Sequence, residues 1–384
     1  MLIRKTRSAL YLIRRKLDEM GNAKVARKKL REVNDYLSRV CQSRPEVLVV
    51  ANFLALGGIR EHIHAIGRFS SRNVLLLPSD EFLAKSSRGE IETINSDQFF
   101  SIDAPSIKAV HTHVFPWAIE FGRQRQAMGN KWIHTYHPLY TQEDVIGEMP
   151  RWQIEFNEAQ LKKACHADVC LSVSKWQVKR FEDNFDVSST YLPNGVDADA
   201  CERASADRFK NQYNIQEPFA LYIGRDDPVK NPGEFARLAT QVPELQCVMV
   251  GRSLDADYLE SNYGVDSPSN LIFLPQMSHS EVLDAISACE VLVVTSKREG
   301  LPTLVMEAMA QSKPIVASRE PGSSEVLGQG SYGFLYELGD IADLKKQLQN
   351  ALGDTNKPAL ARQRVLEHYD WRVVAKQLDQ IYLS

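Results

Sequence analysis

The stretch from Val291 to Ser318 constrains the fold of this chain more than any other part of its sequence. It opens with an apolar run rich in β-branched residues, Val291–Val294, which is typical of a strand buried on both faces. A charged loop follows, and Thr303–Gln311, which begins just after Pro302, consists of good helix formers. Ile315–Ala317 is predicted to form the next strand. This pattern predicts a β-loop-α-β unit whose loop lies at the carboxyl edge of a parallel sheet, where such folds bind ligands.

Two carboxylates and a helix N-terminus belong to this unit. Glu299 precedes the predicted helix, and Glu307 follows its first turn. The backbone N–H groups near Thr303 and Leu304 face the same space and favour an anion. Sugar hydroxyls are bound by carboxylate acceptors, and phosphates by free N–H groups. The unit therefore suits a ligand that carries both a sugar and a phosphate.

The two glutamates have the spacing E-x7-E and lie within the sequence REGLPTLVMEAMA. The bare spacing arises by chance in a long chain, and a solvated loop and helix face is its ordinary interpretation. The Gly-Leu-Pro loop, the Glu-Ala-Met-Ala helix and the preceding buried strand favour a functional motif instead. The segment resembles the signature of the retaining nucleotide-sugar glycosyltransferases of family 4, which have the glycosyltransferase-B fold. The resemblance implies donor contacts from Glu299, Gly300, Leu301, Pro302, Thr303 and Glu307.

A second charged loop follows the predicted strand Phe219–Ile223 and contains Gly224, Arg225 and Lys230. A nucleoside diphosphate gains negative charge as it leaves a sugar, and fixed cations lower that barrier. Arg225 and Lys230 are close enough in the loop to reach one diphosphate. The pattern G-R-x4-K-N resembles the phosphate-binding motif of the same family, with Gly224 as its first residue. The alternative is that both cations pair with the two aspartates that follow Arg225.

The first half of the chain opens with a predicted strand at Glu46–Ala51, and a helix is expected at Ile59–Phe69. Gly57 and Gly58 lie at the turn between them, where glycines let the backbone approach a ligand closely. A tight turn is the simpler interpretation of this pair. The resemblance implies that Gly57 and Gly58 lie beside the donor pyrophosphate and the acceptor.

Histidines end two further predicted strands. His111 and His113 follow Ile107–Val110, and His137 follows Lys131–Thr135. The H-x-H pair could indicate a metal site, but no cysteine or carboxylate stands nearby at ligand spacing, so a metal is disfavoured. The resemblance implies that His137, in the sequence Thr-Tyr-His, lies beside the transferred sugar. His113 is the second acceptor-side candidate, and a core histidine is an equally good interpretation of it.

Other segments extend the resemblance over residues 46–384. The sequence Pro-Asn-Gly-Val-Asp at 193–197 is typical of the end of the first domain, and the polar stretch Ala198–Glu217, which has no strand signal, is predicted to be the linker. Met277 lies in a loop that contacts the nucleotide base in the family. The expected fold is α/β, with two Rossmann-like doubly wound domains facing a cleft. The predicted divisions are a basic helical extension (1–44), an acceptor-side domain (45–200), a nucleotide-sugar-binding domain (215–365) and a helix that crosses back to the first domain (366–384).

The extension at residues 1–44 differs in charge from the rest of the chain. It contains thirteen Lys or Arg and four Asp or Glu, a net charge of +9, which leaves −12 for residues 45–384 because the whole chain carries −3. Its apolar residues recur at helical spacing, for example at Leu30, Val33, Leu37 and Val40. Such a basic amphipathic segment could bind an anionic membrane surface, form a homo-oligomer, or pack on its own domain.

The composition suits a globular protein of a reducing compartment. The six cysteines are scattered, with no CxxC pair. No secretory signal is expected, because charges closely flank the longest early apolar run, and no segment approaches the ~20 apolar residues that a spanning helix needs. The expected location is the cytoplasm, with peripheral attachment to the cytoplasmic membrane face as an option.

These patterns together predict a retaining glycosyltransferase that moves a sugar from a UDP- or GDP-sugar to a glycan, lipid-linked or polymer acceptor, as in the synthesis of cell-surface polysaccharide or glycoconjugates. Arg225 and Lys230 would hold the diphosphate, Glu307 the ribose and Glu299 the sugar, with His137 nearby. No metal or other cofactor is expected, because the two cations supply the charge, and no nucleic acid is expected as a partner. A non-hydrolysing sugar-nucleotide epimerase shares the architecture but lacks the Glu-Gly-Leu-Pro and Glu-Ala-Met-Ala pattern. A catalytically silent nucleotide-sugar-binding scaffold is the other alternative, although both charged motifs are present.

Overall fold

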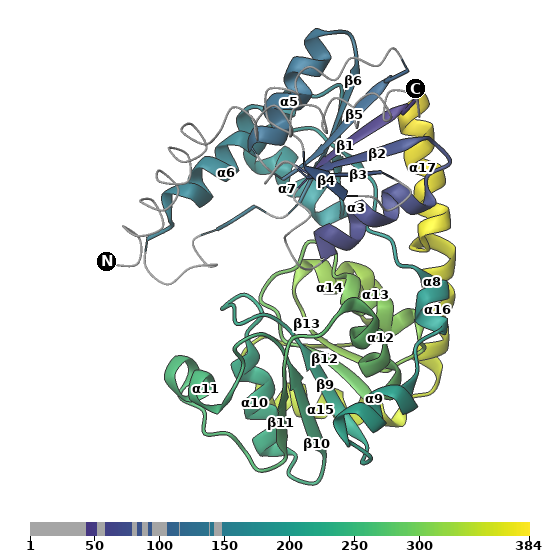
Figure 1. The fold of residues 1–384 in the computed structure, drawn as a ribbon. Helices are drawn as coiled ribbons and strands as arrows, with labels where there is room; N and C mark the ends of the chain where they lie inside the picture. Colours follow the sequence, from purple (N-terminus) through teal and green to yellow (C-terminus); the bar gives the residue numbers. More distant parts are fainter. Residues whose placement is uncertain are drawn as a thin grey trace, which may run out of the picture.

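The computed structural model describes residues 44–51, 58–78, 83–86, 91–93, 106–114, 116–137, 139–141 and 148–384. The basic extension, apart from Arg44, and Gly57 lie outside the described residues. Two β-sheets, each flanked by helices, lie one above the other in Figure 1.

The sheet of the first domain has the strand order β4-β3-β2-β1-β5-β6-β7-β8. Six of these strands pair in parallel, and β3 and β4 add an antiparallel edge. The central strands are buried, as their near-continuous apolar sequences predict. The strands are β1 (Val47–Ala51), β2 (Val74–Pro78), β3 (Leu83–Ser86), β4 (Ile91–Thr93), β5 (Ala109–His113), β6 (Lys131–Tyr136), β7 (Val169–Ser172) and β8 (Thr190–Tyr191).

The sheet of the second domain has the order β11-β10-β9-β12-β13-β14, and all its pairs are parallel. The order reverses between β9 and β12, which is the switch point at which doubly wound sheets bind ligands. The expected α/β fold with two Rossmann-like domains is confirmed. The strands are β9 (Phe219–Ile223), β10 (Gln246–Val250), β11 (Leu271–Leu274), β12 (Val291–Val294), β13 (Ile315–Ser318) and β14 (Phe334–Tyr336).

Helices cover both faces of the second sheet. The core of this domain consists of two apolar clusters. The helix after β12 begins at Thr303, as its sequence predicts, with Pro302 at the N-cap. The helices of the two domains are α3 (Gly58–Phe69), α5 (Pro116–Ala127), α6 (Arg151–Lys162), α7 (Lys175–Phe185), α10 (Pro232–Gln241), α11 (Ala256–Tyr263), α12 (His279–Ala288), α13 (Thr303–Ala310), α14 (Pro321–Val326), α15 (Ile341–Gly353), α16 (Asn356–His368) and α17 (Trp371–Leu383).

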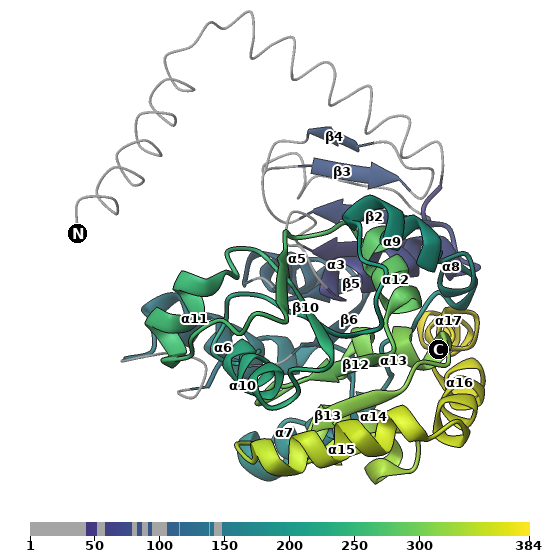
Figure 2. The ribbon, with the colours of Figure 1, turned by 90° about the horizontal axis from the view of Figure 1, so that it is seen from below.

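The last helix, α17, packs on the first domain. Trp371, Val374 and Leu378 lie in the same apolar cluster as residues of β1, β2 and α3. The two segments that connect the domains are hydrogen-bonded to each other, because Val196 N–H donates to the Tyr369 carbonyl at 2.7 Å. Figures 1 and 2 show α16 and α17 running along one side of both domains. The two domains are therefore joined by two chain segments that lie side by side.

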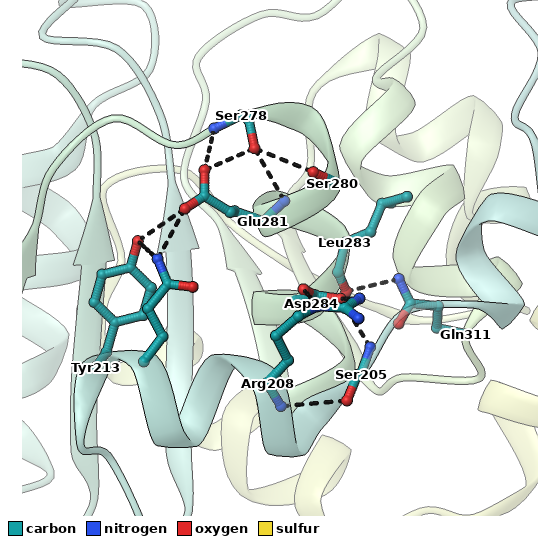
Figure 3. Close-up of polar contacts among 10 residues, drawn as sticks. Ser205, Arg208, Tyr213, Ser278, Ser280, Glu281, Leu283, Asp284 and Gln311 are labelled. Atoms are coloured by element: carbon teal, nitrogen blue, oxygen red, sulfur yellow. Dashed lines mark hydrogen bonds and ion pairs between the residues drawn. The ribbon is translucent and has the colours of Figure 1, made fainter.

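The predicted linker at 198–217 contains two helices that its polar sequence did not suggest, α8 (Ala198–Glu202) and α9 (Ala206–Tyr213). Each begins at a side-chain cap, because Asp197 accepts from Ala200 N–H and Ser205 from Arg208 N–H. Figure 3 shows α9 held against α12, where Asp284 accepts from Ser205 N–H at 2.8 Å and from the Arg208 guanidinium. The linker is thus an ordered part of the second domain.

Candidate active site

The two charged loops meet at the carboxyl edge of the second sheet. Lys230, which follows β9, places its Nζ 2.6 Å from Oε1 of Glu299, which follows β12. Ser296 donates its hydroxyl to the same oxygen at 2.6 Å. The side chains of Lys230 and Glu299 are 25% and 14% exposed, so the pair is largely withdrawn from water. Two motifs that the sequence treats separately thus form one polar cluster.

Arg225 lies apart from this pair. Its side chain is 67% exposed and contacts Asp227 at 3.0 Å. This is the pairing with a following aspartate that the sequence offered as the alternative. An exposed pair of this kind stabilises the fold little, so Arg225 can turn toward an anion at small cost. Gly224, just before it, lies with its carbonyl against Gly251, where an added Cβ would be 2.2 Å from that oxygen. The tight packing of these two glycines brings the loops after β9 and β10 into contact.

A buried carboxylate that the sequence did not single out fixes the backbone of the Glu299 loop. Glu320 accepts from Glu299 N–H at 2.9 Å and from Gly322 N–H at 2.8 Å, and it caps α14. Burial and the charge of Glu299 raise the pKa of Glu320 to about 7. An acidic residue immediately before Pro321 at the start of a helix is a capping signal in the sequence. The loop that carries Glu299 is therefore anchored on α14.

Glu307 lies in α13 and is 7% exposed. His279, the first residue of α12, places Nε2 2.7 Å from Oε1 of Glu307. Burial opposes a charge on His279, but the hydrogen bond to Glu307 and the charges of Glu307, Glu61 and Asp197 outweigh it and raise the pKa of His279 to about 9. The local sequence around His279 does not predict this contact, which joins α12 to α13.

Residues of the first domain contact the segment from Glu299 to Glu307, from which donor contacts are expected. Gly58 opens α3, and a Cβ added to it would lie 3.2 Å from the Thr303 hydroxyl. Trp176 Nε1 donates to the Gly300 carbonyl at 2.7 Å, and Asn194 Nδ2 donates to the Leu301 carbonyl at 2.9 Å. Of the segment singled out from the sequence, Gly300, Leu301 and Thr303 therefore lie at the boundary between the two domains.

The acceptor-side histidines lie deeper in the first domain. His113 and His137 are both buried, and Nδ1 of His113 lies 3.2 Å from Nε2 of His137. His62 of α3 completes the group, with ring centroids 5.4 Å from His113 and 5.7 Å from His137. Burial, with the charges of neighbouring histidines, lowers the pKa of His113 and His137 well below the usual value. Both candidates are therefore neutral at physiological pH, and His113 contacts a histidine rather than a backbone carbonyl.

Two remaining expectations concern the base-contacting loop and a metal. Met277 is half-buried, packs against the core of the second domain and precedes α12 by two residues. Within the described ranges, no three His, Cys, Asp or Glu side chains are arranged to hold a metal ion. No helix of the described residues is long and apolar enough to cross a membrane.

Residues 204–366 match the family of glycosyl transferases group 1. The fold is similar to that of sucrose-phosphate synthase from Thermosynechococcus elongatus, with a TM-score of 0.69 and 20% identity over 88% of this chain and 98% of the other. HepE from Anabaena, in complex with UDP-glucose, gives a TM-score of 0.70 with 16% identity over 87% and 98% of the two chains. The fold is thus that of the glycosyltransferase-B proteins, and the match of residues 204–366 to the glycosyl transferases group 1 agrees with the family expected from the sequence.

Similar sequences are glycosyltransferases as well. A GDP-mannose-dependent monoacylated α-(1-6)-phosphatidylinositol monomannoside mannosyltransferase of Corynebacterium glutamicum is 24% identical over 293 residues, which cover 70% of this chain and 74% of that relative. A sulfoquinovosyl transferase of Arabidopsis thaliana is 25% identical over 169 residues, 42% of this chain, but the match spans only 32% of the plant protein.

Proposed function

We propose that this protein transfers a sugar from a nucleoside diphosphate sugar to a hydroxyl acceptor with retention of configuration. The observation that carries the proposal is the cluster at the switch point of the second sheet. There Lys230 and Glu299 are in contact, and Glu299 and Glu307 flank the N-terminus of α13. A cation beside a helix N-terminus suits a diphosphate, and two carboxylates suit sugar hydroxyls.

Each charged residue of the candidate site would have its own role in the transfer. Lys230 shifts from Glu299 to the diphosphate, and Arg225 leaves Asp227 to join it, so that both stabilise the charge of the leaving group. Glu299, released from Lys230, accepts from hydroxyls of the sugar. Glu307 accepts from the ribose. The neutral His137 lies on the side of the first domain, where the family resemblance places the transferred sugar.

The proposed chemistry needs neither a covalent nucleophile nor a metal. The departing phosphate oxygen takes the proton of the acceptor hydroxyl as the new glycosidic bond forms on the same face of the sugar. Lys230 and Arg225 supply the charge stabilisation that a metal ion supplies in other phosphate sites.

The donor and acceptor classes follow from the relatives. HepE was solved with UDP-glucose, and the Corynebacterium relative uses GDP-mannose, so UDP- and GDP-sugars are the proposed donors. That relative and a phosphatidyl-myo-inositol mannosyltransferase of Mycobacterium tuberculosis, 28% identical over 54% of this chain, act on lipid-linked inositol. A lipid-linked or glycan acceptor, reached at the cytoplasmic membrane face, is therefore the proposal for this chain.

The test begins with nucleotides and ends with turnover. We expect UDP or GDP to raise the melting temperature of the full chain, because ligands that bind only the folded state stabilise it. The sugar donors of the nucleotide that binds are then assayed for release of the diphosphate, with and without lipid and glycan acceptors. Binding without turnover on any acceptor would favour the scaffold alternative, and absence of binding by either nucleotide would contradict the proposal.

A further inference from the structure

His279 lies between carboxylates of two domains. Its Nε2 is 2.7 Å from Glu307 in α13, and its Nδ1 is 3.6 Å from Oε2 of Glu61 in α3. Glu307 belongs to α13 of the second domain and Glu61 to α3 of the first. Figure 1 shows α3 on the side of the first domain that faces the second. A single imidazole thus contacts the donor-binding segment with one nitrogen and the opposite domain with the other.

The surroundings of His279 favour its cationic form. The first turn of a helix is an unfavourable place for a positive charge, and His279 is the first residue of α12. Three carboxylates offset this cost, Glu307 from α13, Glu61 from α3 and Asp197 from the start of α8. Asp197 is itself paired with Arg68 of α3, so the boundary contains charges of both signs from each side.

The contact has a consequence for Glu307. Glu307 is largely buried, with 9% of its side chain exposed, so groups of the protein must fix the orientation of its oxygens. The imidazolium supplies the opposing charge and holds one oxygen in place. Each carboxylate oxygen has a second lone pair, so Glu307 can still accept from hydroxyls while it is bonded to His279.

We propose that His279 is a positioning residue with two roles: it holds Glu307 in the orientation in which that carboxylate accepts from the ribose of the donor, and it links the nucleotide-binding domain to α3 through Glu61. Donor affinity and closure of the two domains then depend on one cation. The first role rests on the proposed function, whereas the link between the domains does not.

The link is tested without any ligand, by hydrogen–deuterium exchange in the full chain. His279→Gln and Glu61→Gln each remove one partner, and we expect both to increase exchange in the first turns of α3. The double variant should exchange no faster than His279→Gln, because both substitutions break the same contact. His368→Gln is the matched control, since it removes an exposed histidine 3.9 Å from Glu367 on the surface of α16. Unchanged exchange in α3, in variants whose melting temperature and circular dichroism are those of the wild type, would overturn the link.

The role toward Glu307 is tested by calorimetry with UDP and GDP. His279→Gln should raise the Kd of the nucleotide that binds by about tenfold or more. Glu61→Gln leaves the Glu307 contact intact and should change that Kd by less than about threefold. In the wild type the Kd should rise as the pH passes about 9, where His279 loses its proton, and the His279→Gln variant should lack that step. A Kd and pH profile that match the wild type would overturn this role. If neither nucleotide binds the wild type, the proposed function and this role both fall, and the exchange measurements still decide the link.

Discussion

Lys230 and Glu299 are 69 residues apart in the chain and in contact in the structure, and Glu299 is held by residues outside both motifs. Ser296 fixes the carboxylate of Glu299, and Glu320 fixes its backbone N–H. In the proposed function, a donor would separate the two charges. At the scale of single residues, the candidate site is therefore a set of ionic contacts that a diphosphate and a sugar would replace in that proposal.

Arg225 gives a prediction at this scale. Arg225→Ala should lower turnover by about two orders of magnitude, because one contact to a developing charge in the transition state is worth ~3 kcal/mol. Steady-state kinetics on the donor identified by nucleotide binding measures the effect. Arg151→Ala is the matched control, since Arg151 is also an exposed arginine beside an acidic neighbour, Glu155, at 2.7 Å. Equal turnover in the two variants would remove Arg225 from the site.

At the scale of elements, the helices of the linker and the histidine-bearing strands decide how the site is supported. The amphipathic faces of the two linker helices are only a few residues long. Packing against α12 stabilises both helices. His111 and His113 of β5 lie on the face of the sheet covered by α3 and α17, whereas His134 of β6 faces α6, where its Nε2 is 2.8 Å from Gln160. Both features depend on contacts with neighbours distant in sequence.

Asp284 of α12 holds the linker helices in place. Asp284→Ala should lower the free energy of unfolding by about 1–3 kcal/mol, because it leaves Ser205 N–H and the Arg208 guanidinium without their buried acceptor. Chemical denaturation measures the change. Glu260→Ala, which removes an exposed carboxylate of α11, should leave the stability within about 0.5 kcal/mol of the wild type. If Asp284→Ala lowers the free energy of unfolding no more than Glu260→Ala does, α9 is held by its apolar contacts alone.

The buried histidines predict an acid-labile first domain. Burial lowers the pKa of His62 and of His134 to about 4, so both stay neutral in the folded state while the unfolded chain takes up protons below about pH 6.5. Stability is therefore present above the unfolded pKa and is lost as the pH falls from about 6.5 toward 4. Hydrogen exchange at pH 7.5 and pH 5 should show β5 and β6 losing protection before β9 and β12. Equal loss in the two sheets would contradict this prediction.

At the scale of the whole molecule, the two domains are joined by more than their crossing chain. Glu325 of α14 accepts from Lys175 N–H and Trp176 N–H at the start of α7, at 2.9 and 3.0 Å. Together with the contacts of Trp176 and Asn194 to the carbonyls of Gly300 and Leu301, this arrangement holds the second domain against the first. A donor bound at the switch point would therefore be enclosed by residues of both domains.

The basic extension bears on where the enzyme works. Residues 1–44 carry +9 against −12 for the remainder, and each Lys or Arg near an anionic surface is worth about 1 kcal/mol, less at high salt. We expect the full chain to bind anionic liposomes at low salt and a chain lacking residues 1–44 to lose that binding. Sedimentation with liposomes measures the binding, and light scattering measures the mass of each form. A change in oligomeric mass without any liposome binding would support self-association instead.

Local sequence patterns are enough to place the regular elements and to identify the charged motifs. Val291–Val294 and Phe219–Ile223 could be placed as buried strands because apolar, β-branched runs have few other stable arrangements. The helix after Pro302 followed from proline at its start and good helix formers behind it. These are local preferences, and they placed Lys230 and Glu299 at one sheet edge before any contact was known.

Contacts between groups far apart in the chain follow from packing and not from local sequence. His279, Glu320 and Glu61 lie in segments whose own sequences predict a helix start or a helix face and nothing more. The contacts of His279 with Glu307 and Glu61, and of Glu320 with Glu299, depend on how α12, α13, α14 and α3 pack. The surroundings that raise the pKa of His279 and of Glu320 arise only after packing. Long-range contacts of this kind have no signature in the spacing of neighbouring residues.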